Sequence, residues 1–97
     1  MMSEIKEIWV FNGSKARFPS AIFVVKADGL DWIENYRLTG TLTKYPVGVS
    51  VYKWAIESGN FKVKSERDST PDFIGNFSSA AQEHMHFENG ATASAAT

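Results

Sequence analysis

The segment IKEIWVF, residues 5–11, places large apolar side chains on both faces that a β-strand would present. Ile8 and Val10 alternate with Trp9 and Phe11, and successive residues of a strand point to opposite faces of its sheet. A strand that is apolar on both faces is typical of the interior of a sheet. We therefore predict that this segment is a central strand covered on both sides.

Turn and cap signals divide the rest of the chain into short elements. The pair Asn12-Gly13 is a strong hairpin signal, and it predicts a returning strand over residues 18–25. Helical spacing over residues 27–37 predicts a helix, with Asp28 as its N-cap. Further apolar patterns predict a strand over 38–45, a helix over 49–58, a strand over 60–64, and a closing hairpin of 73–79 and 82–88.

These elements follow the order β-β-α-β-α-β-β-β. This order predicts an α+β fold, with a mainly antiparallel sheet and two helices packed on it. The chain has 97 residues, which suits one domain, so we expect a single domain over residues 1–90. The ending ATASAAT lacks core-forming side chains and predicts a disordered tail over residues 91–97.

The composition excludes several classes of site. Because the chain has no cysteine, disulfides, thiolate catalysis and cysteine-based zinc sites are excluded. Its 10 basic and 11 acidic residues are interspersed, whereas nucleic-acid-binding domains usually carry a basic patch. The first residues lack the pattern of a signal peptide, and no segment is long enough to cross a membrane. We therefore expect a cytoplasmic protein that binds neither nucleic acid nor membrane.

Four longer motifs stand in this chain as WVFNG, RFPS, LTGTLTKYP and QEHMHFENG. Together they resemble a family of small bacterial proteins and domains of unknown function, whose members share W-V-F-N-G, R-F-P-S, L-T-G-T-L-T-x-Y-P and Q-E-H-x-H-x-E-N-G segments. The resemblance covers about residues 8–90. It implies a bacterial source and a compact single domain, and it implies no reaction, cofactor or catalytic residue.

The only two histidines form the pattern H-x-H-x-E. On a strand, His84, His86 and Glu88 share one face, and Met85 and Phe87 share the other. Such a set could hold a metal or supply a general base, but three successive same-face residues on a straight strand converge poorly on one ion. A further ligand would have to come from an aspartate, namely Asp28, Asp31, Asp68 or Asp72. We therefore predict solvent-facing histidines, no metal site and no cofactor.

The loop over residues 12–18 is the second candidate. Lys15 and Arg17 lie there between Phe11 and Phe18. Basic groups beside aromatic rings can bind single-stranded nucleic acid, and arginine with aromatic residues can anchor a protein interface. The structural alternative is that both rings are buried and the two cations are merely solvated.

These features favour an interaction domain that binds a protein partner through a sheet face or edge and the 12–18 loop. The candidate binding residues are Lys15, Arg17, His84, His86 and Glu88, and no catalytic residue is assigned. Because no phosphate-binding motif or nucleophile elbow is present, an enzyme is the less favoured interpretation. The alternative is a small binding or catalytic module built around the face that carries His84, His86 and Glu88.

Overall fold

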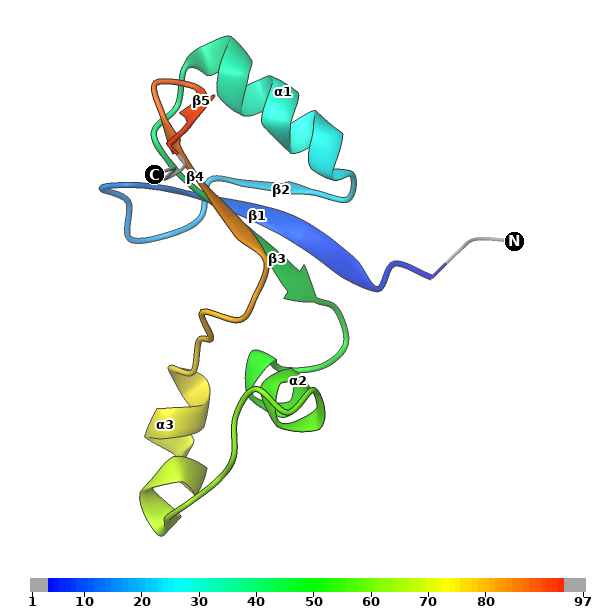
Figure 1. Ribbon diagram of the computed structural model, residues 1–97, viewed down its shortest axis with the longest axis vertical. Helices are drawn as coiled ribbons and strands as arrows, with labels where there is room; N and C mark the ends of the chain where they lie inside the picture. Colours follow the sequence, from blue (N-terminus) through cyan, green and yellow to red (C-terminus); the bar gives the residue numbers. More distant parts are fainter. Residues whose placement is uncertain (1–3, 94–97) are drawn as a thin grey trace.

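The computed structural model describes residues 4–93 and shows a five-stranded antiparallel sheet with helices, so the predicted α+β fold class is confirmed (Figure 1). In chain order the strands are β1 (Glu7–Gly13), β2 (Ala21–Phe23), β3 (Gly40–Pro46), β4 (His84–Glu88) and β5 (Ala91–Thr92). They lie in the order β2-β1-β3-β4-β5, and each neighbouring pair is antiparallel. Strand β1 is therefore internal, as predicted, and β2 forms one edge of the sheet.

The helices are α1 (Lys26–Tyr36), α2 (Val51–Glu57), a 3₁₀ helix (Glu66–Ser69) and α3 (Pro71–Gly75). Helix α1 packs against β1 and β2, whereas the main contact of α2 with the sheet is with β3. Figure 1 shows α2 and α3 together beyond the end of β3, away from α1. We call residues 50–82 the lobe and the rest of the described chain the sheet region. Among residues 4–93, no helix is long and apolar enough to cross a membrane.

The core lies between the sheet and α1. Its buried side chains are Trp9, Phe11, Ile33, Leu42 and Phe87. Burying a large apolar side chain contributes about 1.5–3 kcal/mol to folding, so this cluster is the main source of stability. Gly40 allows β3 to pass close to β1, because a Cβ atom there would collide with the backbone oxygen of Asn12 and the ring of Phe11.

Strand β1 has one buried face, although its sequence predicts that both faces are covered. Trp9 and Phe11 are 5% and 2% exposed on the side of α1, whereas Ile8 and Val10 are only half-buried. The second face lacks a covering helix because α2 lies beside the end of β3 instead of across the sheet. The apolar pattern therefore predicted correctly that β1 lies inside the sheet. Its prediction that both faces of β1 are covered is wrong.

Helix α1 matches its predicted extent, but its predicted cap is wrong. The N-cap residue is Val25, whose side chain makes no capping hydrogen bond, and Asp28 lies inside the first turn. Asp28 still favours the helix there, because a negative charge near the N-terminus interacts well with the helix dipole. The helix ends before Arg37, which adopts a left-handed conformation with a φ of 55°.

Two strands predicted in the lobe are wrong. Residues 60–64 form no strand, and a helix, α3, replaces the start of the strand predicted over 73–79. In place of strand pairing, the rings of the alternating apolar residues meet one another, with centroids 4.9 Å apart for Phe61 and Phe77. Alternation indicates a strand only where a neighbouring strand can pair with it.

The start of α3 follows ordinary capping chemistry. The hydroxyl oxygen of Thr70 accepts a hydrogen bond from the backbone N–H of Phe73 at 3.2 Å, and Pro71 occupies the first turn. Threonine at the N-cap followed by proline is a typical helix start. The signal for a helix start at Thr70 and Pro71 was therefore present in the sequence.

The chain turns back at Asn89 and Gly90, which have positive φ angles of 51° and 87°. Asn-Gly suits this turn because both of its central residues need positive φ. The turn pairs Ala91 and Thr92 with β4, so the first residues of the predicted disordered tail form an edge strand instead. Residues 94–97 lie outside the described residues, and their disorder and the single domain over 1–90 stay predictions.

Candidate functional site

The sheet has one face covered by α1 and one face that we call the open face. The strand register places on the open face the side chains of Ile8, Val10, Asn12, Ile22, Thr41, Thr43, Tyr45, His84, His86, Glu88 and Ala91. None of them is buried, and Ile22 is 64% exposed. The open face therefore remains accessible to a partner.

Cross-strand pairing arranges the open face into rows. Val10 pairs with Ile22 on one side and with Thr43 on the other, and Thr43 pairs with His84. The row therefore runs from the apolar side chains of β2 and β1, through the hydroxyl group of Thr43, to the imidazole of His84 on β4. Side chains that face one another across paired strands are close enough to act as one surface.

The structure brings the two histidines together at the β4 side of the open face. Both are exposed, while Met85 is half-buried and Phe87 is buried, which confirms the predicted orientation of the strand. The imidazole rings of His84 and His86 lie 5.2 Å apart, centroid to centroid, and nearly perpendicular. Glu88 is also exposed on the same strand.

Each histidine has one ring nitrogen engaged. The Nδ1 atom of His84 lies 2.7 Å from the backbone oxygen of Gln82, and because that oxygen can only accept, Nδ1 must carry the proton. The Nδ1 atom of His86 lies 3.2 Å from the hydroxyl oxygen of Thr41. Nδ1 hydrogen bonds hold the rings in place, but in the described part of the chain no group of three histidine, aspartate or glutamate side chains could hold a metal ion.

The loop between β1 and β2 presents two cations and one exposed ring. Lys15 and Arg17 are exposed, and within residues 4–93 neither forms an ion pair. The guanidinium carbon of Arg17 lies 5.7 Å from the ring centroid of Phe18, and Phe18 is 71% exposed. The alternative of two buried rings is therefore wrong for Phe18, although Phe11 is buried.

The edge strand β2 continues this surface. Beyond Ile22, the next residues Val24 and Val25 are 57% and 51% exposed. We call the exposed apolar residues Phe18, Ile22, Val24 and Val25, with the backbone of β2, the β2 edge. Lys15 and Arg17 lie beside the β2 edge, whereas β1 and β3 separate it from the histidines on β4. The five predicted site residues therefore fall into two groups at opposite sides of one sheet.

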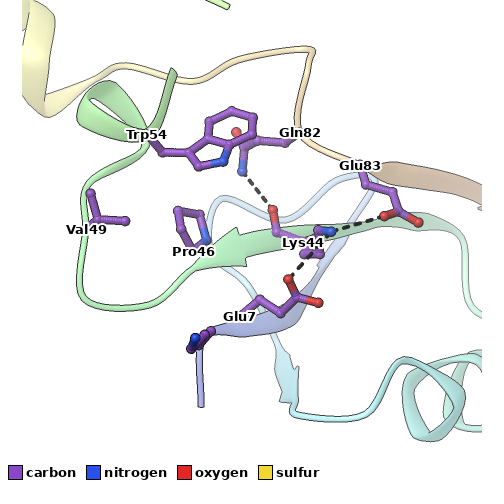
Figure 2. Close-up of a pocket in the computed structure, with 8 residues that line it drawn as sticks. Glu7, Lys44, Pro46, Val49, Trp54, Gln82 and Glu83 are labelled. Atoms are coloured by element: carbon purple, nitrogen blue, oxygen red, sulfur yellow. Dashed lines mark hydrogen bonds and ion pairs between the residues drawn. The ribbon is translucent and has the colours of Figure 1, made fainter. Parts of the chain in front are cut away.

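A pocket of about 350 Å³ lies where the sheet region meets the lobe (Figure 2). Its lining residues are Lys6, Glu7, Lys44, Pro46, Val49, Trp54, Gln82 and Glu83. Trp54 is only half-buried, and its indole forms one wall of this pocket. No sequence pattern indicated the pocket, since its residues come from four separate segments.

Gln82 joins the lobe to the sheet at the bottom of this pocket. It is 4% exposed, and its Nε2 donates to the backbone oxygen of Lys44 at 3.1 Å. Its Oε1 accepts from the backbone N–H of Ser79 at 3.3 Å. The buried amide is therefore satisfied on both sides, and it fixes the lobe to β3 rather than offering a free group to a ligand.

Ion pairs occupy the charged wall of the pocket. Lys44 lies 3.3 Å from Glu83 and 3.6 Å from Glu7, and Lys26 lies 3.3 Å from Glu83. Hydrogen bonds from Lys26 and Lys44 lower the pKa of the Glu83 carboxyl below its ordinary value, and the hydrogen bond to Glu83 raises the pKa of Lys44. Because these charges already satisfy one another, the pocket shows no preference for an anionic or a cationic ligand.

Comparison with protein families finds one family whose model matches this chain. The model of a family described as "Domain of unknown function (DUF7710)" matches residues 8–93. The chain belongs to this family. The open face and the β2 edge both lie within the matched DUF7710 region, and so do the lining residues of the pocket other than Lys6 and Glu7. No curated protein and no solved structure matches the chain.

Proposed function

We propose that this DUF7710 domain is a protein-binding module that binds a partner protein through the open face of the sheet, its β2 edge and the 12–18 loop. The observation that carries the proposal is the uncovered second face of β1, where Ile8 and Val10 remain half-buried beside the exposed Ile22. Exposed apolar groups rimmed by polar residues are typical of interaction surfaces.

The composition of the surface fits this role. Its aliphatic part lies on β1 and β2, with Lys15 and Arg17 at one margin. The hydroxyl groups of β3 follow, and His84, His86 and Glu88 lie at the other margin. Protein interfaces commonly have an apolar centre and a polar rim, and arginine and aromatic residues provide many of their strongest contacts. The Arg17–Phe18 pair supplies both residue types at the β2 margin.

The proposed setting is the bacterial cytoplasm. The resemblance of the four sequence motifs to small bacterial proteins supports a bacterial source. The absence of cysteine is consistent with a reducing compartment. The module would then act on another protein of the same cell by binding alone, without a cofactor.

The test compares a face variant with a lobe variant. Thr43→Arg places a long side chain in the middle of the open face, and Val63→Arg places the same side chain on the exposed surface of the lobe. Proteins that the wild-type domain retains from a lysate of its source organism are identified by quantitative mass spectrometry. Each candidate partner is then purified, and its dissociation constant for the three forms is measured by calorimetry.

The proposal predicts a partner whose affinity falls about tenfold or more in Thr43→Arg, because hot-spot contacts lie near the centre of an interface. The same partner should bind Val63→Arg as tightly as the wild type. Melting curves must show that both variants are folded. A partner that tolerates Thr43→Arg but loses affinity for Val63→Arg would move the binding surface to the lobe.

A further inference from the structure

We infer that the partner contributes an extended, acidic segment that pairs with β2 and becomes the sixth strand of the sheet. This inference rests on the proposed function, because it specifies which part of the partner protein binds the β2 edge. It follows from three features of the edge, which are its unpaired backbone, its exposed apolar side chains and its uncompensated positive charge.

The first feature is the backbone of β2. This strand ends the sheet and pairs with β1 alone, through three residues. Its outer side therefore presents backbone donors and acceptors to solvent, and such an edge is a template for another strand. Natural edges are protected by short length, charged side chains, proline or bulges. Strand β2 is short, with three residues, but Ala21, Ile22 and Phe23 include no charge and no proline. The nearest proline, Pro19, lies before the strand and limits how far pairing could extend.

The second feature is the position of the exposed apolar side chains. Ile22 points to the open face beside Val10, and Phe18 and Val24 extend the apolar surface along the chain on either side. A sixth strand beside β2 would place every second side chain over this surface. The partner segment should therefore carry aliphatic or aromatic residues at alternate positions.

The third feature is the local charge. Lys15 and Arg17 are exposed and form no ion pair within residues 4–93, whereas Lys26 and Lys44 are matched by glutamates. The net charge of the whole chain is −1, so the positive charge of this loop is a local feature and not a property of the whole molecule. Charge complementarity across an interface guides binding, and it favours aspartate or glutamate in the part of the segment that passes the loop.

The other edge of the sheet is less suited to the same role. There β5 already pairs with Phe87 and Glu88 of β4. The uncovered part of β4 presents His84, which is polar, and the preceding Glu83 is held by Lys26 and Lys44. An apolar acidic segment would find neither aliphatic side chains nor free cations there.

The experiment selects short random peptides displayed on phage against the full-length domain and measures the affinity of the enriched sequences. The expected peptides alternate apolar residues with aspartate or glutamate. Each peptide is then synthesised in two forms, with N-methyl groups on the odd or on the even amides. Because only alternate amides of a paired strand face its neighbour, one form should lose binding about tenfold or more and the other should bind nearly as well as the parent.

Charge reversal supplies the second readout. The double variant Lys15→Glu/Arg17→Glu should weaken peptide binding about tenfold and reduce its salt dependence. The matched control is Lys62→Glu/Lys64→Glu, which makes the same charge change at two exposed residues of the lobe and should leave the affinity unchanged. Melting temperatures of both double variants establish that the domain remains folded.

Several results would overturn the inference. These are selection of no peptide, equal binding of both N-methylated forms, or indifference to the Lys15→Glu/Arg17→Glu change. A dimer in light scattering that Ile22→Lys dissociates would instead assign the β2 edge to a second copy of the chain. A protein partner that is sensitive to Thr43→Arg but not to the charge reversal would leave the proposed function standing without the added strand. A protein partner that is sensitive to neither Thr43→Arg nor the charge reversal would contradict both the proposed function and the added strand.

Discussion

The sheet region and the lobe use aromatic residues in different ways. In the sheet region, Trp9, Phe11 and Phe87 are almost inaccessible to solvent beneath α1. In the lobe, the rings of Tyr52, Phe61, Phe73 and Phe77 form a cluster with centroid distances of 4.9–6.3 Å, yet all four remain half-buried. Ala55 and Gln82 are the buried residues of the lobe.

This difference indicates two levels of stability in one small protein. The sheet region combines a closed apolar core with continuous backbone pairing, whereas the lobe combines partial ring burial with short helices and caps such as Thr70. Regions with few buried apolar contacts open locally at lower free energy than the core. We therefore expect the sheet region, which carries the open face, to stay folded when the lobe opens locally.

Loss of a core ring should have the largest effect. Trp9→Ala removes a side chain that is 5% exposed, so it should lower the free energy of unfolding by about 3–5 kcal/mol. Urea denaturation of the variant and the wild type measures this change. A variant that melts close to the wild type would show that the packing of β1 against α1 is not the core of the fold.

Loss of a lobe ring should have a smaller and more local effect. Phe61→Ala removes contacts with three other rings, and because the site is half-buried the cost should be about 2 kcal/mol. Amide hydrogen exchange should accelerate over residues 50–82 and remain slow in β1 and β3. Equal acceleration in both regions would mean that the molecule unfolds as one cooperative unit.

The ion pairs at the junction of the two regions predict a weak pH dependence. The pKa of Glu83 is lowered in the folded state from its ordinary value of 4.5. Its contribution to stability is therefore complete above 4.5 and is lost as the pH falls through the folded-state pKa. The melting temperature of Glu83→Gln should lie slightly below that of the wild type at neutral pH, and the difference should vanish in acid. A difference in melting temperature that grows in acid would contradict a stabilising ion pair at Glu83.

Zinc should leave the histidines unchanged. Ring proton signals of His84 and His86 in NMR spectra should not shift at micromolar zinc, because a stable zinc site needs three or four protein ligands. The control is the same titration of His84→Ala. Tight zinc binding that requires both His84 and His86 would support the alternative, a small binding or catalytic module on the β4 side of the open face.

The sequence predicted the sheet region well because its signals there agree. Alternation in β1 and β4 and the helical spacing of α1 both act within a few residues. The hairpin between β1 and β2 also forms, although Asn12 and Gly13 end β1 and the turn follows them. The same rules failed in the lobe, where Phe61 and Phe73 alternate with polar neighbours but contact other rings. The pocket at Trp54 and the exposure of Phe18 depend on how distant segments meet, which no local pattern contains.

Candidate binding residues were predictable as residue types but not as one surface. The exposure of Lys15, Arg17, His84 and His86 follows from their polarity. The role of Ile22 in the open face could not be inferred, because its apolar side chain predicts burial just as that of Val10 does. The missing information was the position of α2, which leaves one face of the sheet uncovered.

We expect the sheet region to provide most of the stability of the fold and to form the surface that recognises the partner. Residue-resolved amide hydrogen exchange of the domain, with and without a selected acidic peptide, tests this expectation most directly. Amides of β1 and β3 should exchange most slowly in the free protein, and the peptide should slow exchange in β2 and the 12–18 loop while exchange in residues 50–82 is unchanged. Protection of the lobe by the peptide, with β2 unchanged, would contradict it.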